Sequence, residues 1–368
     1  MKKVKLIPSL LALVGVLALT SCGGSSLKTG SGINMAWAEK VGFFARASSV
    51  IEDEDTRYVV YETNEKKNEN VTSFALRKGN KQSDGSWVYE KNRTIILKAS
   101  TDSWDKYIFS PTVIKGEFKK GETTYNYLLA YGGRKQEKDI ANQVGIAYAE
   151  SLEGPWVKHS EPIIKYDASE YGDEYGAGAP SLLSYNKKGQ ARLFHSYAET
   201  NLANERVIDC DFSDLNNIIL DTGYRHITVN GLRDNADNVI LANADFATSE
   251  DGTLYLVRDV YPLSGNLPGN ATSLQVARAN VNILNNFVSY SWEIVETFTT
   301  SMTVDYEDED SMGWDEIYSG SFVRDPYGYI TTLDGEIEYY YSTADEPEEI
   351  DDETYKFSPN IAFRKLSV

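Results

Sequence analysis

The stretch YIFSPTVIKGEF (107–118), YNYLLAYGG (125–133), VGIAYAES (144–151) and WVKHSEPII (156–164) decides the fold. Its four short runs are rich in Val, Ile, Leu and Tyr, and polar residues, Gly and Pro separate them. Short runs of this kind between turn residues are typical of β-strands. Here and in the rest of the chain beyond the N-terminal segment, no apolar repeat with helical spacing extends over a dozen residues. The stretch therefore predicts a unit of four β-strands.

The same order of strands recurs along the chain, and each unit begins with small residues. The starts are spaced 62, 69, 65 and 75 residues apart, at Ser48, Ser110, Ala179, Ala244 and Ser319. A four-stranded unit that recurs at this interval is typical of a β-propeller. We therefore predict an all-β chain that forms a single five-bladed β-propeller, with the five starts lining one central channel. Two stacked β-sandwiches are the alternative, because strand spacing alone does not separate the two folds.

The fifth unit contains one strand fewer than the others. We expect the segment INMAWA (33–38) to supply the missing outer strand and so to close the ring. This places the propeller domain at residues 33–368. A ring of this kind has to close for stability, because no unit buries both of its faces alone.

The N-terminus resembles a bacterial lipoprotein signal. Lys2, Lys3 and Lys5 precede an apolar stretch from Leu6 to Leu19, which is too short for a stable membrane span, and the stretch ends in Leu-Thr-Ser-Cys at residue 22. The resemblance implies that residues 1–21 are removed and that Cys22 carries the lipid, with residues 22–32 as a flexible tether. We therefore expect a lipid-anchored, extracytoplasmic protein at the cell membrane. An ordinary secretory signal with an incidental cysteine is the alternative.

Composition excludes several classes of function. The net charge of -19 disfavours binding to nucleic acids, whose phosphates it would repel. Only 3 His and 2 Cys are present, which argues against a zinc cluster or a disulfide framework, and we expect no metal and no cofactor. The acidic segment at 304–316 lacks the residue pattern of a calcium loop and is read as a solvated loop. Cys210 lies in a strand and is expected to be buried and structural. In contrast, 25 Tyr and 6 Trp suit a surface that contacts sugars.

Two motifs point to a family of enzymes. The second and third units open with a small residue and Pro, at Ser110-Pro111 and Ala179-Pro180. The second unit also has a turn with the residues Ser151, Gly154, Pro155 and Trp156. Together they resemble the five-bladed propellers of glycosidases related to glycoside hydrolase family 43, from about Phe43 to the C-terminus. The resemblance implies a protein that acts on or binds a poly- or oligosaccharide.

The catalytic acids of that family do not map onto this chain. The family takes a general base Asp from the first blade, a second Asp that tunes the acid, and a Glu as general acid. The first unit opens with RASS (46–49) and the third with GAP (178–180), and neither string contains a carboxylate. The fourth unit opens with NAD (243–245) and keeps one acid.

Acids on the loops that enter the innermost strands are the candidates for catalysis, because these loops line the rim of a propeller funnel. They are Asp102, Asp105, Asp173, Glu174, Asp237, Asp245, Asp315 and Glu316. Asp245 ranks first, because it lies within an apolar strand start where burial raises the pKa of a carboxyl group. Glycoside hydrolysis needs two carboxyl groups, so we expect Glu174 or Glu316 as its partner. A structural carboxylate that accepts backbone N–H groups is the alternative for Asp245, and solvated loop acids are the alternative for the others.

Three further side chains are candidate substrate contacts. Arg46 would hold a hydroxyl-rich or anionic group with two hydrogen bonds, unless it pairs with a neighbouring acid. Trp314 would stack on a sugar ring, and Tyr318 lies close by in the sequence.

Three functions therefore stay open: a lipid-anchored glycoside hydrolase, a glycan-binding lipoprotein that lacks the catalytic acids, and a propeller that binds other proteins.

Overall fold

The computed structural model describes residues 34–367, apart from 41, 139, 172–174, 199–202, 234–239, 262, 265–266, 269–270, 281–289, 304–313, 334, 345–348, 351–352 and 355–359. This part of the chain is almost entirely β-structure, as expected. Its helices are the short α1 (Ala168–Tyr171) and one 3-10 turn at Thr300–Thr303. Among these residues, no helix has the length and apolar character needed to cross a membrane.

Three antiparallel sheets form the middle of the chain. The first contains β7 (Tyr107–Lys120), β8 (Thr123–Arg134), β9 (Gln143–Ala149) and β10 (Val157–Lys158). The second contains β11 (Gly176–Ser184), β12 (Gln190–Ala198), β13 (Ala203–Asp211) and β14 (Ile219–Leu220), with β15 (Arg225–His226) also paired to β13. The third contains β16 (Asp245–Thr248), β17 (Thr253–Val260), β20 (Ser273–Asn280) and β21 (Glu293–Thr299).

The two ends of the chain share a fourth, ten-stranded sheet. Its first group is β2 (Arg46–Asp53), β3 (Thr56–Asn64), β4 (Thr72–Lys81), β5 (Trp87–Tyr89) and β6 (Thr94–Lys98). Its second group is β22 (Glu316–Arg324), β23 (Thr332–Leu333), β24 (Glu336–Ala344), β27 (Asn360–Ser367) and β1 (Asn34–Trp37). Two short hairpins, β18 (Leu263–Ser264) with β19 (Leu267–Pro268) and β25 (Glu349–Ile350) with β26 (Glu353–Thr354), stand apart.

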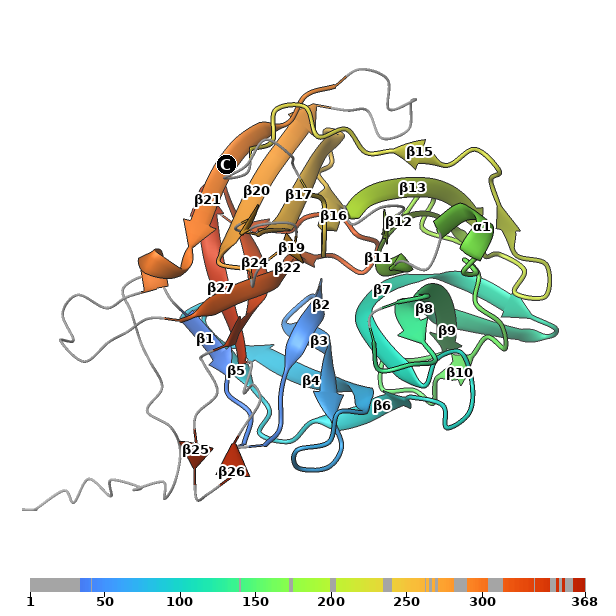
Figure 1. Cartoon of the computed structure of the whole chain (residues 1–368), viewed down its shortest axis with the longest axis horizontal. Coiled ribbons are helices and arrows are strands. Elements are labelled where there is room, and N and C mark those ends of the chain that lie inside the picture. The colour runs from blue at the N-terminus through green and yellow to red at the C-terminus, as the bar shows by residue number, and fades with distance from the viewer. Residues whose placement is uncertain are drawn as a thin grey trace, which may run out of the picture.

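A weak seam divides this large sheet into its two groups. β2 and β22 pair in parallel through two residue pairs, Val50 with Val323 and Ile51 with Arg324, whereas every other neighbour in the sheet is antiparallel. The groups of strands are arranged around a common centre, where β2, β7, β11, β16 and β22 lie (Figure 1). The chain is therefore a β-propeller rather than two stacked sandwiches.

The apolar core follows the same circular order. Its buried residues form five clusters among the described residues, and each cluster lies between two neighbouring groups of strands. For example, Ile114 and Leu128 from one group pack with Leu182 and Leu193 from the next. Each interface thus needs both neighbours, because neither sheet face is covered by its own group. Cys210 is a buried member of one cluster, as expected, and burial raises the pKa of its thiol.

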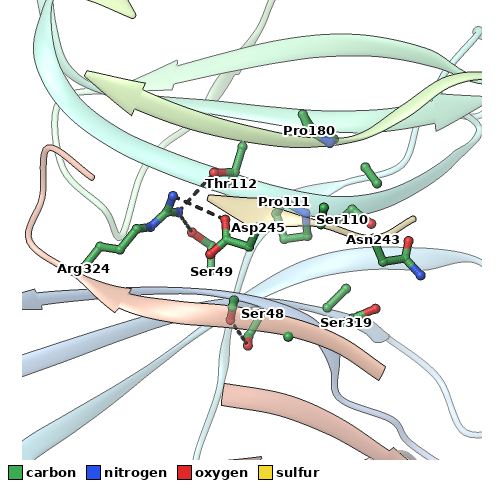
Figure 2. A pocket seen from close by; sticks show the side chains of 15 residues that line it. Ser48, Ser49, Ser110, Pro111, Thr112, Pro180, Asn243, Asp245, Ser319 and Arg324 are labelled. Carbon is green, nitrogen blue, oxygen red and sulfur yellow. Dashed lines mark hydrogen bonds and ion pairs between the residues drawn. The ribbon is translucent and has the colours of Figure 1, made fainter. Parts of the chain in front are cut away.

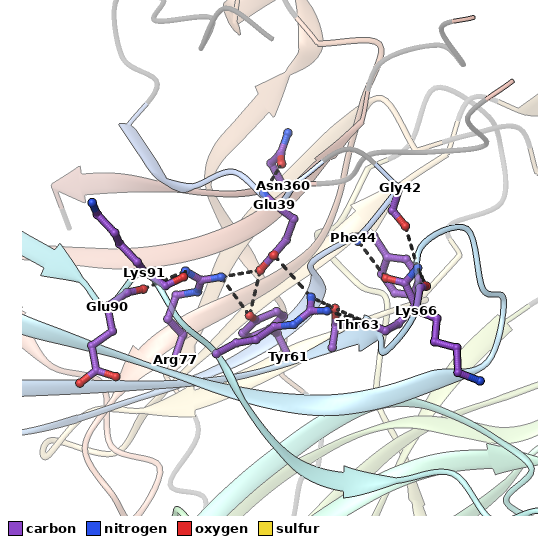
Figure 3. Close-up of polar contacts among 12 residues, drawn as sticks. Glu39, Gly42, Phe44, Tyr61, Thr63, Lys66, Arg77, Glu90, Lys91 and Asn360 are labelled. Carbon is purple, nitrogen blue, oxygen red and sulfur yellow. Dashed lines mark hydrogen bonds and ion pairs between the residues drawn. The ribbon is translucent and has the colours of Figure 1, made fainter. Parts of the chain in front are cut away.

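The N-terminal strand closes the ring, as the sequence indicated. β1 pairs antiparallel with β27, the last strand of the chain. Directly after β1, the buried carboxylate of Glu39 reaches into the first group, where it accepts hydrogen bonds from Arg77 Nη2 at 2.6 Å and from the hydroxyl of Tyr61 at 3.0 Å (Figure 3). Its backbone N–H donates to Asn360 Oδ1 at 3.1 Å, beside the last strand. The residues around Glu39 therefore join the first group of strands to the last.

Candidate functional site

The starts of the five inner strands meet at one pocket. The five predicted starts all line it, and small or hydroxyl-bearing residues dominate its wall (Figure 2). The lining residues are Ala47, Ser48, Ser49, Ser110, Pro111, Thr112, Ala179, Pro180, Asn243, Ala244, Asp245, Ser319, Gly320, Ser321 and Arg324. The space between these residues measures about 360 Å³ when the open solvent at its mouth is counted. The prediction that the starts share one central cavity is therefore confirmed.

Each inner strand enters the pocket through the same backbone kink. One non-glycine residue per unit has a positive φ between 41° and 51°, a left-handed conformation that such residues rarely adopt. These residues are Ala47, Ser110, Ala179, Asn243 and Ser319. Kinks of this kind turn the neighbouring side chains away from the regular strand direction. Here they turn the start of every inner strand toward the common axis.

Deeper in the pocket, a chain of hydrogen bonds links each unit to the next. In four units, the second residue after the kink accepts a backbone N–H from the inner strand of the following unit. The acceptors are Ser49 Oγ for Val113 N (3.2 Å), Thr112 Oγ1 for Leu182 N (3.2 Å), Ser181 Oγ for Phe246 N (3.1 Å) and Asp245 Oδ2 for Phe322 N (2.9 Å). The polar wall is therefore also what holds the inner strands together.

Arg324 lies in the middle of this ring. Its side chain is only 1% exposed, and Nη1 approaches Asp245 Oδ1 at 3.3 Å. The same guanidinium donates to the carbonyls of Leu182 (3.2 Å) and Phe246 (3.0 Å) and to the hydroxyl of Thr112 (3.3 Å). Because guanidinium groups have several donors in a fixed plane, one side chain can bind several units at once. Arg324 therefore fills the channel and neutralises the carboxylate beside it.

The turn that follows Arg324 closes the far end of the channel. Pro326, Tyr327 and Gly328 each accept a backbone hydrogen bond from a different inner strand. The donors are Lys115 N (2.6 Å), Ser184 N (2.9 Å) and Thr248 N (3.4 Å), in that order. The donors come three or four residues after the last pocket-lining residues of their strands, so this turn lies away from the strand starts at the mouth.

Asp245 takes the same place in this ring that hydroxyl groups take in the neighbouring units. Its Oδ1 accepts from the Ser181 hydroxyl at 2.7 Å and its Oδ2 accepts the N–H of Phe322, in addition to the contact with Arg324. Both carboxylate oxygens are therefore engaged with the protein. The arrangement matches the structural alternative considered for this residue.

Two buried acids that sequence reasoning did not select lie on second strands, directly behind the kinks. Glu62 on β3 is 2% exposed and pairs with Arg46, whose Nε is 2.6 Å from Glu62 Oε2. The other oxygen, Oε1, accepts the N–H of the kink residue Ser110 in the next unit at 2.6 Å. Arg46 therefore binds a neighbouring acid, which was the alternative considered for it.

Asp259 on β17 repeats this pattern three units further on. Its Oδ1 accepts the N–H of the kink residue Ser319 at 2.7 Å, and its Oδ2 accepts from Asn243 Nδ2 at 2.7 Å and from Tyr261 Oη at 3.1 Å. Asp259 is fully buried, and desolvation raises its pKa to about 7. Glu205 on β13 is also fully buried, and burial raises its pKa well above the usual range. An acid inside an apolar strand, as in YLVRDV (255–260), is the signal that would have pointed to Asp259.

The residue before each kink directly precedes the pocket lining in the sequence, and we call these five residues the rim, although none of them is itself a lining residue. Arg46, Phe109 and Tyr318 hold this position in three units, and Gly178 and Ala242 hold it in the other two. Phe109 and Tyr318 are half-buried residues, and the hydroxyl group of Tyr318 is buried. Burial is the main cause of a raised pKa at Tyr318, whose hydroxyl also lies within electrostatic reach of several acids. The repeat that singled out Arg46 and Tyr318 would have identified Phe109 as well.

Gly178 leaves room for the Phe109 ring. A Cβ atom at residue 178 would lie 2.9 Å from Phe109 Cε2 and 2.6 Å from the hydroxyl of Tyr175. The ring also packs on Gly132, where a Cβ atom would lie 2.3 Å from Phe109 Cε2, and the guanidinium carbon of Arg134 stands 5.2 Å from the ring centre. The position of Phe109 at the mouth is therefore fixed from two sides.

The other predicted residues are dispersed. Glu316 begins β22 and is half-buried, whereas Glu174, Asp173 and Asp237 lie outside the described residues. Trp314 is 6% exposed and belongs to a core cluster, so the structure leaves little of its ring for stacking on a sugar. Among the remaining acids, Asp102 and Asp315 are exposed, and Asp105 is buried in an ion pair with Lys158 at 2.6 Å.

Comparison with known proteins gives a fold but no close relative. No protein-family model matches the sequence, and no curated protein matches it either. Solved structures do match along most of the chain. The catalytic domain of a GH62 α-L-arabinofuranosidase from Coprinopsis cinerea is 11% identical, with a TM-score of 0.56, and the match covers 92% of this chain and 98% of that one.

Two further matches are an endo-arabinase from Bacteroides thetaiotaomicron and a GH43 enzyme from Xanthomonas citri in complex with xylotriose. The endo-arabinase is 12% identical, with a TM-score of 0.51 and coverage of 92% and 98%. The Xanthomonas enzyme is 11% identical, with a TM-score of 0.55 and coverage of 91% and 90%. The chain therefore has the fold of the β-propeller glycosidases, as its motifs indicated.

Proposed function

We propose that this protein binds a carbohydrate at the mouth of the central pocket and does not hydrolyse it there. One observation carries the proposal: among the described residues that line the pocket, Asp245 is the only carboxylate, and Arg324 neutralises it. Hydrolysis of a glycosidic bond by the usual routes needs two carboxyl groups that flank the bond. The described part of the pocket offers the hydrogen-bonding groups for a sugar without this pair.

The chemistry of the rim supports a sugar as the ligand. Hydroxyl and amide side chains, such as Ser110, Asn243 and Ser319, line the mouth and both donate and accept hydrogen bonds. Phe109 and Tyr318 are half-buried aromatic residues next to these positions, and aromatic rings beside a binding mouth pack on the apolar C–H face of a sugar. The shared fold with proteins named as arabinofuranosidase and endo-arabinase makes arabinose- or xylose-containing glycans the first ligands to examine.

Binding of short oligosaccharides tests this proposal. We expect titration calorimetry to detect an oligosaccharide from a panel that includes xylotriose, with no release of reducing sugar. Phe109→Ala should weaken that binding by tenfold or more, because it removes an aromatic contact of about 1.4 kcal/mol. Val88→Ala is the matched control, because Val88 is an exposed apolar residue on β5 that is 56% accessible and does not line the pocket. Equal affinity of the wild type and Phe109→Ala would contradict the assignment of the mouth.

Hydrolysis remains the second candidate, and Asp259 is the observation that favours it. A carboxyl group with a pKa near 7 is suited to donate a proton, and Glu62 in its ion pair with Arg46 would be the ionised partner. Both side chains are almost fully buried behind the mouth, so a substrate would have to displace Asn243 or Arg46 to reach them. Reducing-sugar release that disappears in Asp259→Asn would establish this function and refute the non-catalytic one.

We also propose that the protein is held at a membrane by a lipid on Cys22. The sequence at 1–22 supports this proposal, and these residues lie outside the described part. Cys22→Ala should release the protein into the soluble fraction of the cells that produce it. If the variant stays with the membrane, the lipid anchor is excluded.

A further inference from the structure

A stack of side chains outside the central pocket lies on the outer part of the sheet that contains β11 to β15. The guanidinium carbon of Arg206 on β13 stands 3.7 Å from the ring centre of Tyr197 and 4.1 Å from that of Tyr224. The Tyr197 hydroxyl and His226 Nδ1 share a hydrogen bond of 2.7 Å. Arg206 is thus held between two tyrosine rings, an arrangement that stabilises both by cation–π attraction.

The outermost ring of this stack is open to solvent. Tyr224 is 45% exposed, although Arg206 covers one of its faces. The ring of His226 meets it at 5.7 Å with an interplanar angle of 83°, so it contacts only a part of the ring. The exposed surface of Tyr224 is therefore mainly the face opposite Arg206, and that face is held in a fixed orientation.

Hydrogen-bonding groups lie beside the exposed ring. The guanidinium of Arg206 covers its inner face, and the exposed imidazole of His226 meets it at 5.7 Å. The ion pairs of Asp209 with Arg192 and Arg225 lie on the other face of β13, because Arg206 and Asp209 are three residues apart in a regular strand. An aromatic face beside hydrogen-bonding groups fits a sugar, whose ring has an apolar C–H face and a polar edge of hydroxyl groups. It fits an apolar protein partner less well, because such a partner would cover the Tyr224 hydroxyl and His226 without binding them.

We propose that Tyr224 is the platform of a second carbohydrate site, which binds an internal sugar of a longer glycan chain. The site rests on the proposed function, since it assumes that the pocket binds the same class of ligand. β15 and its neighbour β13 lie toward the periphery, whereas the pocket is at the centre (Figure 1). Only a glycan long enough to reach both sites, or one that binds the platform by itself, would contact Tyr224. The fixed orientation of the ring lowers the entropy lost on binding.

Affinity electrophoresis in gels with soluble arabinan or arabinoxylan tests the platform, together with calorimetry on xylotriose. Tyr224→Ala should weaken polysaccharide binding by about tenfold and leave xylotriose binding unchanged. Tyr224→Phe keeps the ring and should bind like the wild type. Ile219→Ala is the matched control, because Ile219 is an exposed apolar residue, 55% accessible, on the neighbouring edge strand β14.

The two proposals fail in different ways. If Phe109→Ala leaves xylotriose binding unchanged, the pocket assignment fails, and polysaccharide binding that still depends on Tyr224 supports the platform alone. The platform is refuted if Tyr224→Ala binds polysaccharide as tightly as Ile219→Ala, or if the wild type is retarded by neither polysaccharide.

Discussion

Replacing Arg324 with methionine should destabilise the whole propeller, because this side chain connects several units at the centre. The guanidinium contacts Asp245 at 3.3 Å and donates to the carbonyls of Leu182 and Phe246, and its side chain is 1% exposed. Methionine has a similar length but no charge, so Asp245 would be left as a buried carboxylate without its cation. Removing one partner of a buried ion pair costs about 3–5 kcal/mol.

A second substitution separates this charge effect from a simple loss of packing. In the units before Asp245, hydroxyl groups accept the same kind of backbone N–H, so Asp245→Ser restores the neighbouring pattern. We expect the double variant Asp245→Ser/Arg324→Met to be more stable than the sum of the two single changes predicts, by at least about 1 kcal/mol. The coupling arises because the second change removes the charge that the first one leaves unpaired.

Urea unfolding followed by tryptophan fluorescence measures these free energies. Arg278→Met is the matched control, since Arg278 pairs with Glu293 on the surface with side-chain exposures of 36% and 67%. Exposed ion pairs contribute about 0–1 kcal/mol, so this variant should unfold close to the wild type. A loss below about 1 kcal/mol for Arg324→Met, or strict additivity in the double variant, would refute the central role of the ion pair.

Three further predictions concern the interfaces between units. Because burial raises the pKa of Asp259 to about 7, the folded state holds its proton more tightly than the unfolded state, and the free energy of unfolding should fall as the pH rises from about 4 to 7. Asp259→Asn should flatten this fall when urea unfolding is measured at several pH values. An unchanged slope would exclude Asp259 as its source. Glu39→Gln should lower the free energy of unfolding by about 3 kcal/mol, because Arg77 loses its buried carboxylate. A thermal midpoint equal to that of the wild type would show that Glu39 does not stabilise the junction between the first and last groups of strands. Gly178→Ala should displace Phe109, whose ring atom would lie 2.9 Å from the new Cβ, and so weaken oligosaccharide binding in calorimetry without loss of the fold; unchanged affinity would show that the mouth adapts.

The circular order of the strands could be predicted because similar units of strands repeat along the sequence. Each start combines small residues with a following apolar run, and the kinks at Ser110 and Ala179 occur at the predicted positions. The outer strand at 34–37 could be placed because the last unit was short by one strand. These features depend on residues close together in sequence, so the period alone reveals them.

The site was harder to predict because its contacts join residues that are far apart in the chain. Arg324 appears as the end of an apolar strand, and nothing near it in the sequence indicates that Asp245, 79 positions earlier, is its partner. Trp314 and Glu316 are two residues apart in sequence, yet Trp314 packs in a core cluster before the strand begins, whereas Glu316 is the half-buried first residue of β22. Sequence proximity therefore did not identify residues that share a site.

Many hydrogen-bond donors and acceptors at the bottom of the pocket are already bound to other groups of the protein. Ser181 Oγ and both oxygens of Asp245 are bound to neighbouring units, and Arg324 closes the floor. A ligand that entered this far would have to break bonds that hold the ring together, at a cost of about 1 kcal/mol or more for each buried group left unpaired. Affinity therefore has to come from the rim, where Phe109 and Tyr318 are partly exposed. Such a mouth suits the end of a glycan rather than a chain threaded through the ring, because the buried Arg324 side chain and the turn that follows it stand in the way.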